Sequence, residues 1–255
     1  MQQTLSYEGY TLVFEDNFDS RILNRENWVV EQHEPGWVNA EWQRYVDSPE
    51  TVFLREGKLC LKSVKTVEAD GTISYASGRI STEHKQDFTY GIFEARLKVP
   101  RGAGLLPAFW LMATDEERYG NWPCCGEIDI MEIKGQDSKT NYATIHFGLP
   151  HQQRQGVFTL EAEDFADSFH TFSLEWLPGM LRWYVDGKLF FQETSWYSTD
   201  AQGVRMPFPA PFDHKMYLIL NLAVGGNWVG YPDETTEFDA AIYAVDYVKV
   251  YQITT

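Results

Sequence analysis

The sequence has little of what several common protein classes require, and cysteine is the clearest case. Its 255 residues include only three cysteines, Cys60, Cys124 and Cys125, with no CxxC pair and no cysteine–histidine spacing typical of a metal site. An odd number of cysteines with one adjacent pair does not form a disulfide framework. We therefore expect Cys124 and Cys125 to be free thiols.

Positive charge is also scarce. The chain carries 21 lysines and arginines against 37 aspartates and glutamates, which gives a formal net charge of -16. So acidic a surface disfavours nucleic acid and anionic membranes as partners, because phosphate binding needs clustered lysine and arginine. It equally disfavours polyanionic substrates, whereas neutral ligands are unaffected. Taken alone, the acidity is explained equally well by a role in keeping the protein soluble.

Long apolar runs are missing. No stretch approaches the length of a transmembrane helix, and the first ten residues, MQQTLSYEGY, lack the basic and apolar regions of a signal peptide. We expect a secreted, cell-surface or periplasmic protein whose signal peptide has been removed. A cytoplasmic protein that begins at Met1 is the alternative, and the sequence leaves both open.

Turn signals and alternating apolar residues are abundant, while helical periodicity is rare. Residues 91–99, GIFEARLKV, alternate apolar side chains with Glu94, Arg96 and Lys98, which predicts a half-buried strand. Asp-Gly pairs at 70–71 and 186–187 lie between strand-like runs and predict hairpins.

The remaining strand-like runs indicate a single β-sandwich. Residues 216–224, MYLILNLAV, are nearly all apolar and predict a strand buried on both faces. Residues 10–18 and 246–254 also alternate, so both ends of the chain are expected to pair in the same sheets. No linker, repeat or low-complexity tract interrupts residues 1–255. We therefore predict one all-β domain, a sandwich of two antiparallel sheets.

The stretch GEIDIME, residues 126–132, places three carboxylates among isoleucines and a methionine. Residues two apart in a strand share a face, so Glu127 and Asp129 point the same way. Regular pleating would send Glu132 to the opposite face. A β-bulge near Ile130 or Met131 would return it, which predicts three carboxyls in a line along one strand.

Three aligned carboxyls have more than one reading. Mutual repulsion separates their pKa values, so one can stay protonated as an acid while another stays ionised as a nucleophile, as glycosidic bond cleavage requires. The alternatives are a row of solvated carboxylates or a calcium site. Calcium fits less well, because acids aligned on one strand do not surround an ion as a loop does.

This stretch resembles the catalytic signature of glycoside hydrolase family 16, in the bulged form found in laminarinase-like endo-β-1,3-glucanases. The resemblance covers most of the chain, in order and spacing. It is carried by LVFEDNFD, SGRISTEHKQDFTYGIFEARLKVPRGAGLLPAFWLM, ATIHFG, FHTFSLEW, LNLAVGGNW and VDYVKVYQ.

The resemblance implies a β-jelly-roll sandwich of the concanavalin A-like type with a concave substrate cleft. It implies retaining endo-hydrolysis of β-1,3- or mixed-linkage β-1,3-1,4-glucans through a covalent glycosyl-enzyme intermediate, with no cofactor for catalysis. Glu127 would be the nucleophile and Glu132 the general acid/base. Asp129 would hydrogen-bond the nucleophile and tune the pair. Spacing alone does not distinguish nucleophile from acid.

The resemblance also implies a set of sugar-binding residues. Sugar rings stack on aromatic faces, and their hydroxyls need polar partners. For each tryptophan taken singly, core packing is the more common role, and for Arg79 and His146 a structural ion pair or hydrogen bond is the alternative. The matching positions are Trp122, Trp110, Trp228, Asn39, Glu41, Arg79 and His146.

Two further points follow from the resemblance. The family commonly has WPAFW where this chain has LLPAFW, so Leu106 replaces a stacking tryptophan, which puts strict laminarin specificity in doubt. Family members often carry a structural calcium bound by two backbone carbonyls and one aspartate. The matching positions are Glu15, Gly57 and Asp246, although Asp246 could equally be an ordinary strand-edge acid.

Other functions stay open on the same fold. A non-catalytic β-glucan-binding lectin is disfavoured because all three acids are present. A transglycosylase, in which a sugar instead of water resolves the intermediate, is not distinguished by these residues, and galactan hydrolysis is a weaker contender. The expected partner is a neutral β-glucan, and the expected state is a monomer.

Overall fold

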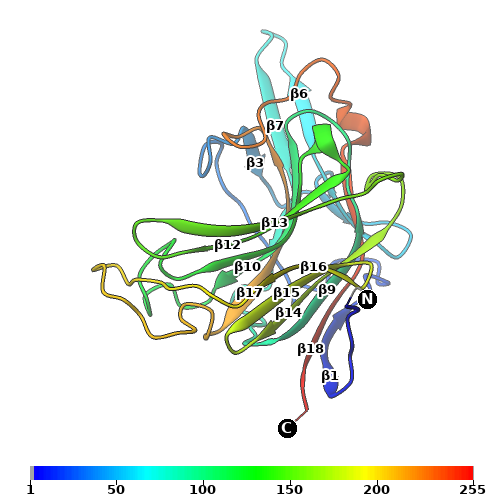
Figure 1. Ribbon diagram of the computed structural model, residues 1–255. Helices are drawn as coiled ribbons and strands as arrows, with labels where there is room; N and C mark the ends of the chain where they lie inside the picture. Colours follow the sequence, from blue (N-terminus) through cyan, green and yellow to red (C-terminus); the bar gives the residue numbers. More distant parts are fainter. Residues whose placement is uncertain (1–2, 255) are drawn as a thin grey trace.

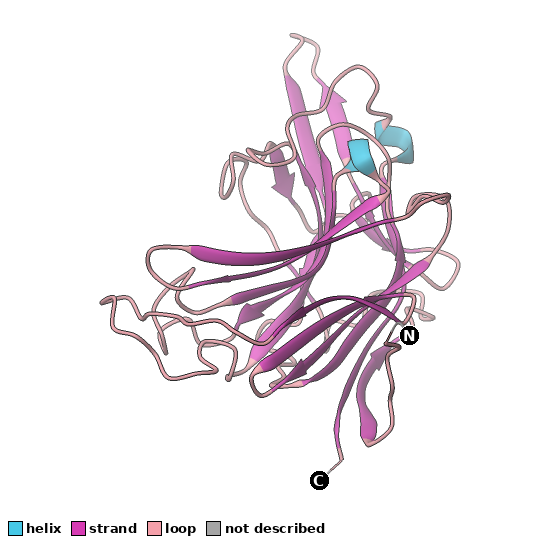
Figure 2. Ribbon diagram, in the orientation of Figure 1, coloured by secondary structure: helices cyan, strands magenta, loops and turns pink. Residues whose placement is uncertain are grey.

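The computed structural model describes residues 3–254, which are almost entirely β-strands and loops (Figures 1 and 2). Within this range the helical segments are two short 3₁₀ turns, Gly135–Asp137 and Phe238–Ala240. No helix in the described part of the chain is long and apolar enough to cross a membrane. The scarcity of helical periodicity in the sequence is thus matched by the fold.

Two large antiparallel sheets form a sandwich of the jelly-roll type, and a small third sheet lies beside them (Figure 1). The first sheet runs β16 (Lys188–Glu193), β15 (Met180–Val185), β14 (His170–Leu177), β9 (Gly91–Lys98), β18 (Ile242–Ile253), β5 (Leu59–Lys62) and β4 (Val52–Leu54), with β1 (Tyr10–Asp16) paired to β18. The second runs β13 (Gln152–Thr159), β12 (Thr140–Phe147), β11 (Glu127–Ile133), β10 (Leu105–Ala113), β17 (Met216–Val224), β8 (Arg79–Ser81) and β2 (Val29–Val30). The third contains β3 (Gln43–Tyr45), β7 (Ile73–Ser77) and β6 (Val64–Val67).

The core fills the space between the two large sheets. All nine residues of β17 are buried, which confirms the strand predicted for residues 216–224. Where the layers meet, the indole nitrogen of Trp183 on β15 donates a hydrogen bond to the backbone oxygen of Asp129 on β11, at 2.9 Å. This contact ties one sheet to the strand that carries the carboxylates.

Both predicted hairpins are present. Asp186 and Gly187 connect β15 to β16 with φ angles of 48° and 71°, and a two-residue turn with positive φ at both positions matches the twist of its strands. The turn at residues 70–71 connects β6 to β7. β1 pairs with β18 antiparallel, from Tyr10 opposite Ile253, so the prediction for the two ends of the chain is also confirmed.

Strand β9 corrects one detail of the prediction. The alternation in residues 91–99 predicts an exposed polar face that includes Glu94, yet Glu94 is only 4% exposed. It accepts hydrogen bonds from Ser173 and Tyr247, and from Tyr7 in the segment before β1. Because the donors come from three other segments, alternation within β9 does not reveal this burial.

Gly91 at the start of β9 tests this packing. An added Cβ would lie 2.2 Å from the backbone oxygen of Tyr251, and its φ is +129°. We expect Gly91→Ala to lower the free energy of unfolding by about 3 kcal/mol in a urea melt, because backbone must move and φ is strained. Gly187→Asn is the control, since Asn tolerates positive φ and nothing lies within 4 Å there. Equal stability of the two variants would contradict this account.

Candidate active site

Strand β11 contains the predicted bulge. On one side, Phe109 of β10 pairs with Met131 and Trp110 pairs with Asp129, which leaves Ile130 as the extra residue. The register to β12 shifts in the same interval. Ile130 and Met131 are both buried in the core, so Glu132 returns to the face of Glu127 and Asp129.

The three carboxyls lie in surroundings that oppose negative charge. Burial raises the pKa of Glu127 to about 8, and the neighbouring charge of Asp129 acts in the same direction. Burial likewise raises the pKa of Asp129, which is 3% exposed. The pKa of Glu132 is raised well above its ordinary value, first by burial and then by the charges of Asp129 and Glu127. Burial and mutual repulsion therefore favour the protonated forms of these carboxyls.

Two side chains act against this rise at Glu127. The indole nitrogen of Trp122 donates a hydrogen bond to Glu127 Oε2 at 2.9 Å. His146 Nε2 lies 3.9 Å from Glu127 Oε1 and 3.3 Å from Asp129 Oδ2, and its charge lowers the pKa of Glu127. A hydrogen bond to the charged form favours ionisation. The Glu127 carboxylate thus accepts an indole hydrogen bond that favours its ionised form, whereas at Glu132 the backbone N–H donates to Asn141 Oδ1 at 3.2 Å.

The same group could hold a metal ion. One ligand atom each from Glu127, Asp129 and His146 lie within 4.8 Å of one another. Two carboxylate oxygens and an imidazole nitrogen suit a transition metal better than calcium, which takes oxygen ligands. The proton-binding role of these carboxyls does not depend on an ion.

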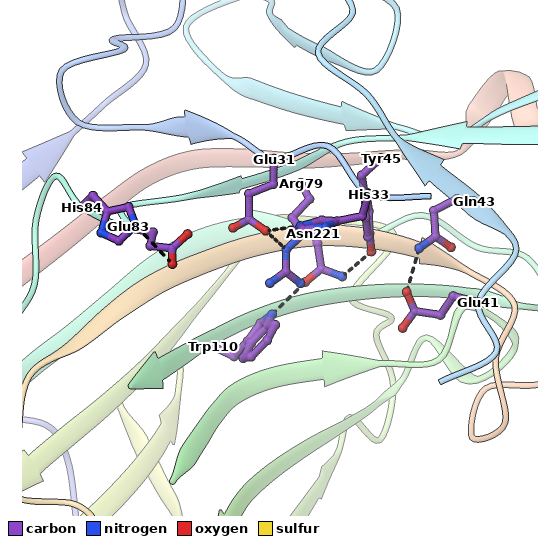
Figure 3. Close-up of polar contacts among 10 residues, drawn as sticks. All are labelled: Glu31, His33, Glu41, Gln43, Tyr45, Arg79, Glu83, His84, Trp110 and Asn221. Carbon is purple, nitrogen blue, oxygen red and sulfur yellow. Dashed lines mark hydrogen bonds and ion pairs between the residues drawn. The ribbon is translucent and has the colours of Figure 1, made fainter. Parts of the chain in front are cut away.

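Trp110 on β10 and Arg79 on β8 lie close together across β17, the strand between them (Figure 3). The Arg79 guanidinium is 5.0 Å from the Trp110 ring and forms a buried ion pair with Glu31. The Trp110 indole donates to Asn221 Oδ1 at 2.7 Å. Trp110 pairs with Asp129 across the strands, so this network adjoins the carboxylate row.

Three more of the predicted sugar-binding residues, Asn39, Glu41 and Trp228, are linked by contacts between two loops. Asn39 Nδ2 donates to Glu41 Oε1 at 3.3 Å, and the Asn39 backbone oxygen accepts from the amide of Asn227. The next residue, Trp228, is 42% exposed and packs edge-on against Tyr142, the strand partner of Glu132. These contacts connect Asn39 and Glu41 to the loop beside the carboxylates.

Comparison with known proteins now identifies the family. A profile of glycosyl hydrolases family 16 matches residues 38–248. The chain belongs to glycosyl hydrolases family 16.

Three relatives show how similar the chain is to other members of the family. Glucan endo-1,3-beta-glucosidase A1 of Niallia circulans is 38% identical over 96% of this chain, which spans only 38% of that protein. Glucan endo-1,3-beta-glucosidase of Cryptopygus antarcticus is 36% identical, covering 96% of this chain and 93% of the relative. The solved structure of SCLam, a non-specific endo-beta-1,3(4)-glucanase from family GH16, superposes with a TM-score of 0.83 at 34% identity, over 99% of this chain and 95% of that one.

The structure adds two residues that the sequence did not single out. Trp37 is 49% exposed, stacks on His33 with ring centroids 3.5 Å apart, and lies 5.3 Å from the Arg79 guanidinium. His151 lies in the loop after β12 and contacts His146. Trp37 precedes the predicted sugar-binding residue Asn39 by two positions, and this proximity is a sequence signal for Trp37. No feature of the sequence near His151 predicts its contact with His146.

The predicted calcium positions lie apart from the carboxylate row, and their residues do not fit an ion as they stand. The Asp246 carboxylate is bound by Arg96 at 2.6 Å and lies 3.9 Å from the Lys58 nitrogen. The Glu15 carboxylate is bound by Lys249 at 2.9 Å. Gly57 occupies a turn with a φ of +67°. Two cations thus face the Asp246 carboxylate, and calcium at these positions stays a prediction. The prediction for the cysteines is confirmed, since all three are free and buried.

The raised pKa of Glu127 has a consequence for stability. A carboxyl whose pKa is higher in the folded state than in the unfolded state stabilises the fold at pH values below the unfolded-state pKa. For Glu127 this contribution is lost as the pH rises through its folded-state pKa of about 8. Glu127→Gln removes the charge, so we expect it to be more stable than the unmodified chain by about 2 kcal/mol at pH 8. Urea melts at intervals from pH 4.5 to 8 measure this difference. A difference that does not grow with pH would show that Glu127 is not destabilised by its burial.

Proposed function

We propose that the chain is a retaining endo-β-glucanase that cleaves β-1,3- or mixed β-1,3-1,4-linkages. The observation that carries this proposal is the row of three carboxyls on the bulged strand, with Asp129 buried and Trp122 hydrogen-bonded to Glu127. A lectin has no use for protons held at raised pKa values beside a sugar site. Family membership is consistent with the same chemistry.

The proposed reaction has two steps. Glu132 donates its proton to the glycosidic oxygen as the Glu127 carboxylate attacks the anomeric carbon, so the leaving sugar departs with a hydroxyl group. Glu132, now ionised, then takes a proton from water, and that water attacks the anomeric carbon and releases Glu127. Two displacements retain the anomeric configuration. Asp129 lies between the two and hydrogen-bonds Glu127, which tunes the pKa values of the pair.

The surroundings of the carboxyls support this division of roles. Glu127 has the indole donor and the His146 ring, which favour its ionised form. The pKa of Glu132 is raised by two neighbouring carboxyls as well as by burial, which suits a group that must begin protonated.

The substrate class rests on the relatives and on charge. The names of the three relatives specify 1,3-β-glucan or β-1,3(4)-glucan substrates. A net charge of -16 favours a neutral polymer over a sulfated or uronic one. Transglycosylation is the second candidate, because a sugar hydroxyl can replace water in the attack on the proposed intermediate.

Product analysis tests the proposal. The chain is incubated with laminarin, barley-type β-1,3-1,4-glucan and carboxymethylcellulose, and released oligosaccharides are separated by size. We expect mixed-size oligosaccharides from one or both of the first two polymers, initially in the β-anomeric form by proton NMR. Glu127→Gln should lose at least about 10³-fold in kcat while still binding polymer, and Asp129→Asn should lose less.

Several outcomes would contradict the proposal. Binding without release from any polymer would favour the lectin. Near-normal turnover by Glu127→Gln would show that Glu127 is not the nucleophile. Equal losses of kcat in Glu127→Gln and Asp129→Asn would show that Asp129 has more than a supporting role. Products longer than the starting oligosaccharides would favour the transglycosylase.

Leu106 allows a test of specificity. It lies on β10, four residues before Trp110 and opposite Ala223 of β17, and is partly exposed. A tryptophan at this position, as the family motif WPAFW has it, would add a stacking surface, so Leu106→Trp should raise kcat/KM on laminarin relative to mixed-linkage glucan by about tenfold. Leu106→Met, which adds no ring, is the control. An unchanged ratio would exclude Leu106 as a determinant of linkage preference.

A further inference from the structure

A pocket lined by aromatic rings opens in the long loop between β16 and β17, outside the carboxylate row. This loop is drawn yellow to orange in Figure 1 and lies at one end of the sandwich. The pocket has a volume of about 400 Å³, within the range of roughly 300–1,000 Å³ found for small-molecule sites. It is lined by Trp196, Tyr197, Arg205, Met206, Pro207 and Phe208. None of these residues takes part in the proposed cleavage reaction.

Two of the rings that line the pocket are held in place by their neighbours. Trp196 is only 5% exposed, and its indole nitrogen donates to the backbone oxygens of Pro209 and Ala210 at 3.1 and 3.2 Å. Phe208 is 53% exposed, yet its ring packs against that of Trp196 with centroids 4.8 Å apart. The Phe208 ring also lies so close to Gly179 that a Cβ there would be 2.5 Å from it. The pocket therefore has a fixed aromatic wall that faces solvent.

The opposite wall carries a guanidinium that no carboxylate engages. Arg205 Cζ lies 5.0 Å from the centre of the Tyr197 ring, and Tyr197 is 49% exposed. Among the described residues, the arginines that form ion pairs do not include Arg205. The acid within this loop, Asp200, instead accepts hydrogen bonds from the amides of Gln202 and Val204. The guanidinium thus keeps its N–H groups for a ligand.

The loop that carries the pocket is tied to both segments beside Trp122. The hydroxyl of Thr199 accepts from the amide of Leu149 and donates to its carbonyl. Leu149 belongs to the loop between β12 and β13, which also contacts the Trp122 ring. On the other side, the amide of Ala201 donates to the backbone oxygen of Tyr119. Because Trp122 and Leu149 are both exposed, apolar surface leads from the proposed nucleophile toward the pocket.

We propose that this pocket is a second sugar-binding site, which takes a distant unit of the same neutral β-glucan chain that lies at the carboxylate row. Sugar rings stack on exposed aromatic faces, and a guanidinium donates to neighbouring hydroxyl groups. Rings that are already fixed lose little entropy on binding, and the net charge of -16 disfavours an anionic ligand. The inference rests on the proposed function for the identity of the polymer.

Binding of a long and a short ligand tests the proposal. The Glu127→Gln chain serves as the parent, because it should leave the ligands intact. Calorimetry gives the dissociation constants for the tighter-binding of laminarin and barley-type β-glucan, and for a trisaccharide prepared from it. The polymer can span the row and the pocket, whereas the trisaccharide is too short. Tyr197→Ala in this parent should weaken polymer binding about fivefold and leave trisaccharide binding unchanged.

Further variants separate the pocket from the rest of the loop. Phe208→Ala removes the other exposed ring and should weaken polymer binding similarly. Tyr197→Phe keeps the ring and should bind as the parent does. Val204→Ala changes an exposed apolar residue of the same loop that does not line the pocket, and it should also have no effect. Urea melts check that each variant keeps its fold.

Kinetics gives an independent measurement. In the chain with Glu127 intact, Tyr197→Ala should raise KM for the polymer about fivefold and leave kcat unchanged, because the pocket does not touch the reacting atoms. A loss of kcat at constant KM would overturn the inference, since it would place the effect at the carboxylate row.

The binding data can also contradict the inference. It is overturned if polymer affinity is unchanged in both Tyr197→Ala and Phe208→Ala, or if the polymer and the trisaccharide lose affinity equally. A chain that binds polymer without cleaving it overturns the proposed function alone, because the affinities of the variants still decide whether the pocket binds sugar. A chain that binds neither polymer overturns both.

Discussion

The extra residue in β11 is the constraint on which the site depends. Ile130 and Met131 both turn into the core, so the isoleucines on either side keep their burial while Glu132 joins Glu127 and Asp129 on the opposite face. A strand without the bulge would have to bury Glu132 between the sheets or expose an apolar residue. The apolar packing of the sandwich therefore supplies the free energy that holds three mutually repelling carboxyls in one row.

That row is maintained at a cost in stability. Each carboxyl is removed from water and faces another, which favours protonation and raises the pKa. The groups that oppose this rise differ along the strand: Trp122 and His146 act on Glu127, and His146 and Lys134 act on Glu132. Because relief is unequal along the strand, the carboxyls acquire different protonation states, which an acid and a nucleophile working together require.

Around the row, aromatic rings and buried polar groups support one another across distant segments. Arg79 is held by Glu31 and lies against Trp110, which is oriented by Asn221 (Figure 3). The Trp37 ring also lies against Arg79. These residues come from β8, β10, β17 and loops, so the rings are positioned by contacts between segments and not by their own strand. Rings that are already fixed lose little side-chain entropy when a ligand binds to them.

The sequence by itself determined the strands, the hairpins and the acidic row, because alternation, Asp-Gly turns and the spacing of Glu127, Asp129 and Glu132 are local properties. It also indicated the family, through motifs spread along the chain. Only the tertiary structure decided the burial of Glu94, the ion pairs at Asp246 and the contact of His151 with His146. Each of these depends on a partner from another segment, and which segments meet is set by how the sheets pack.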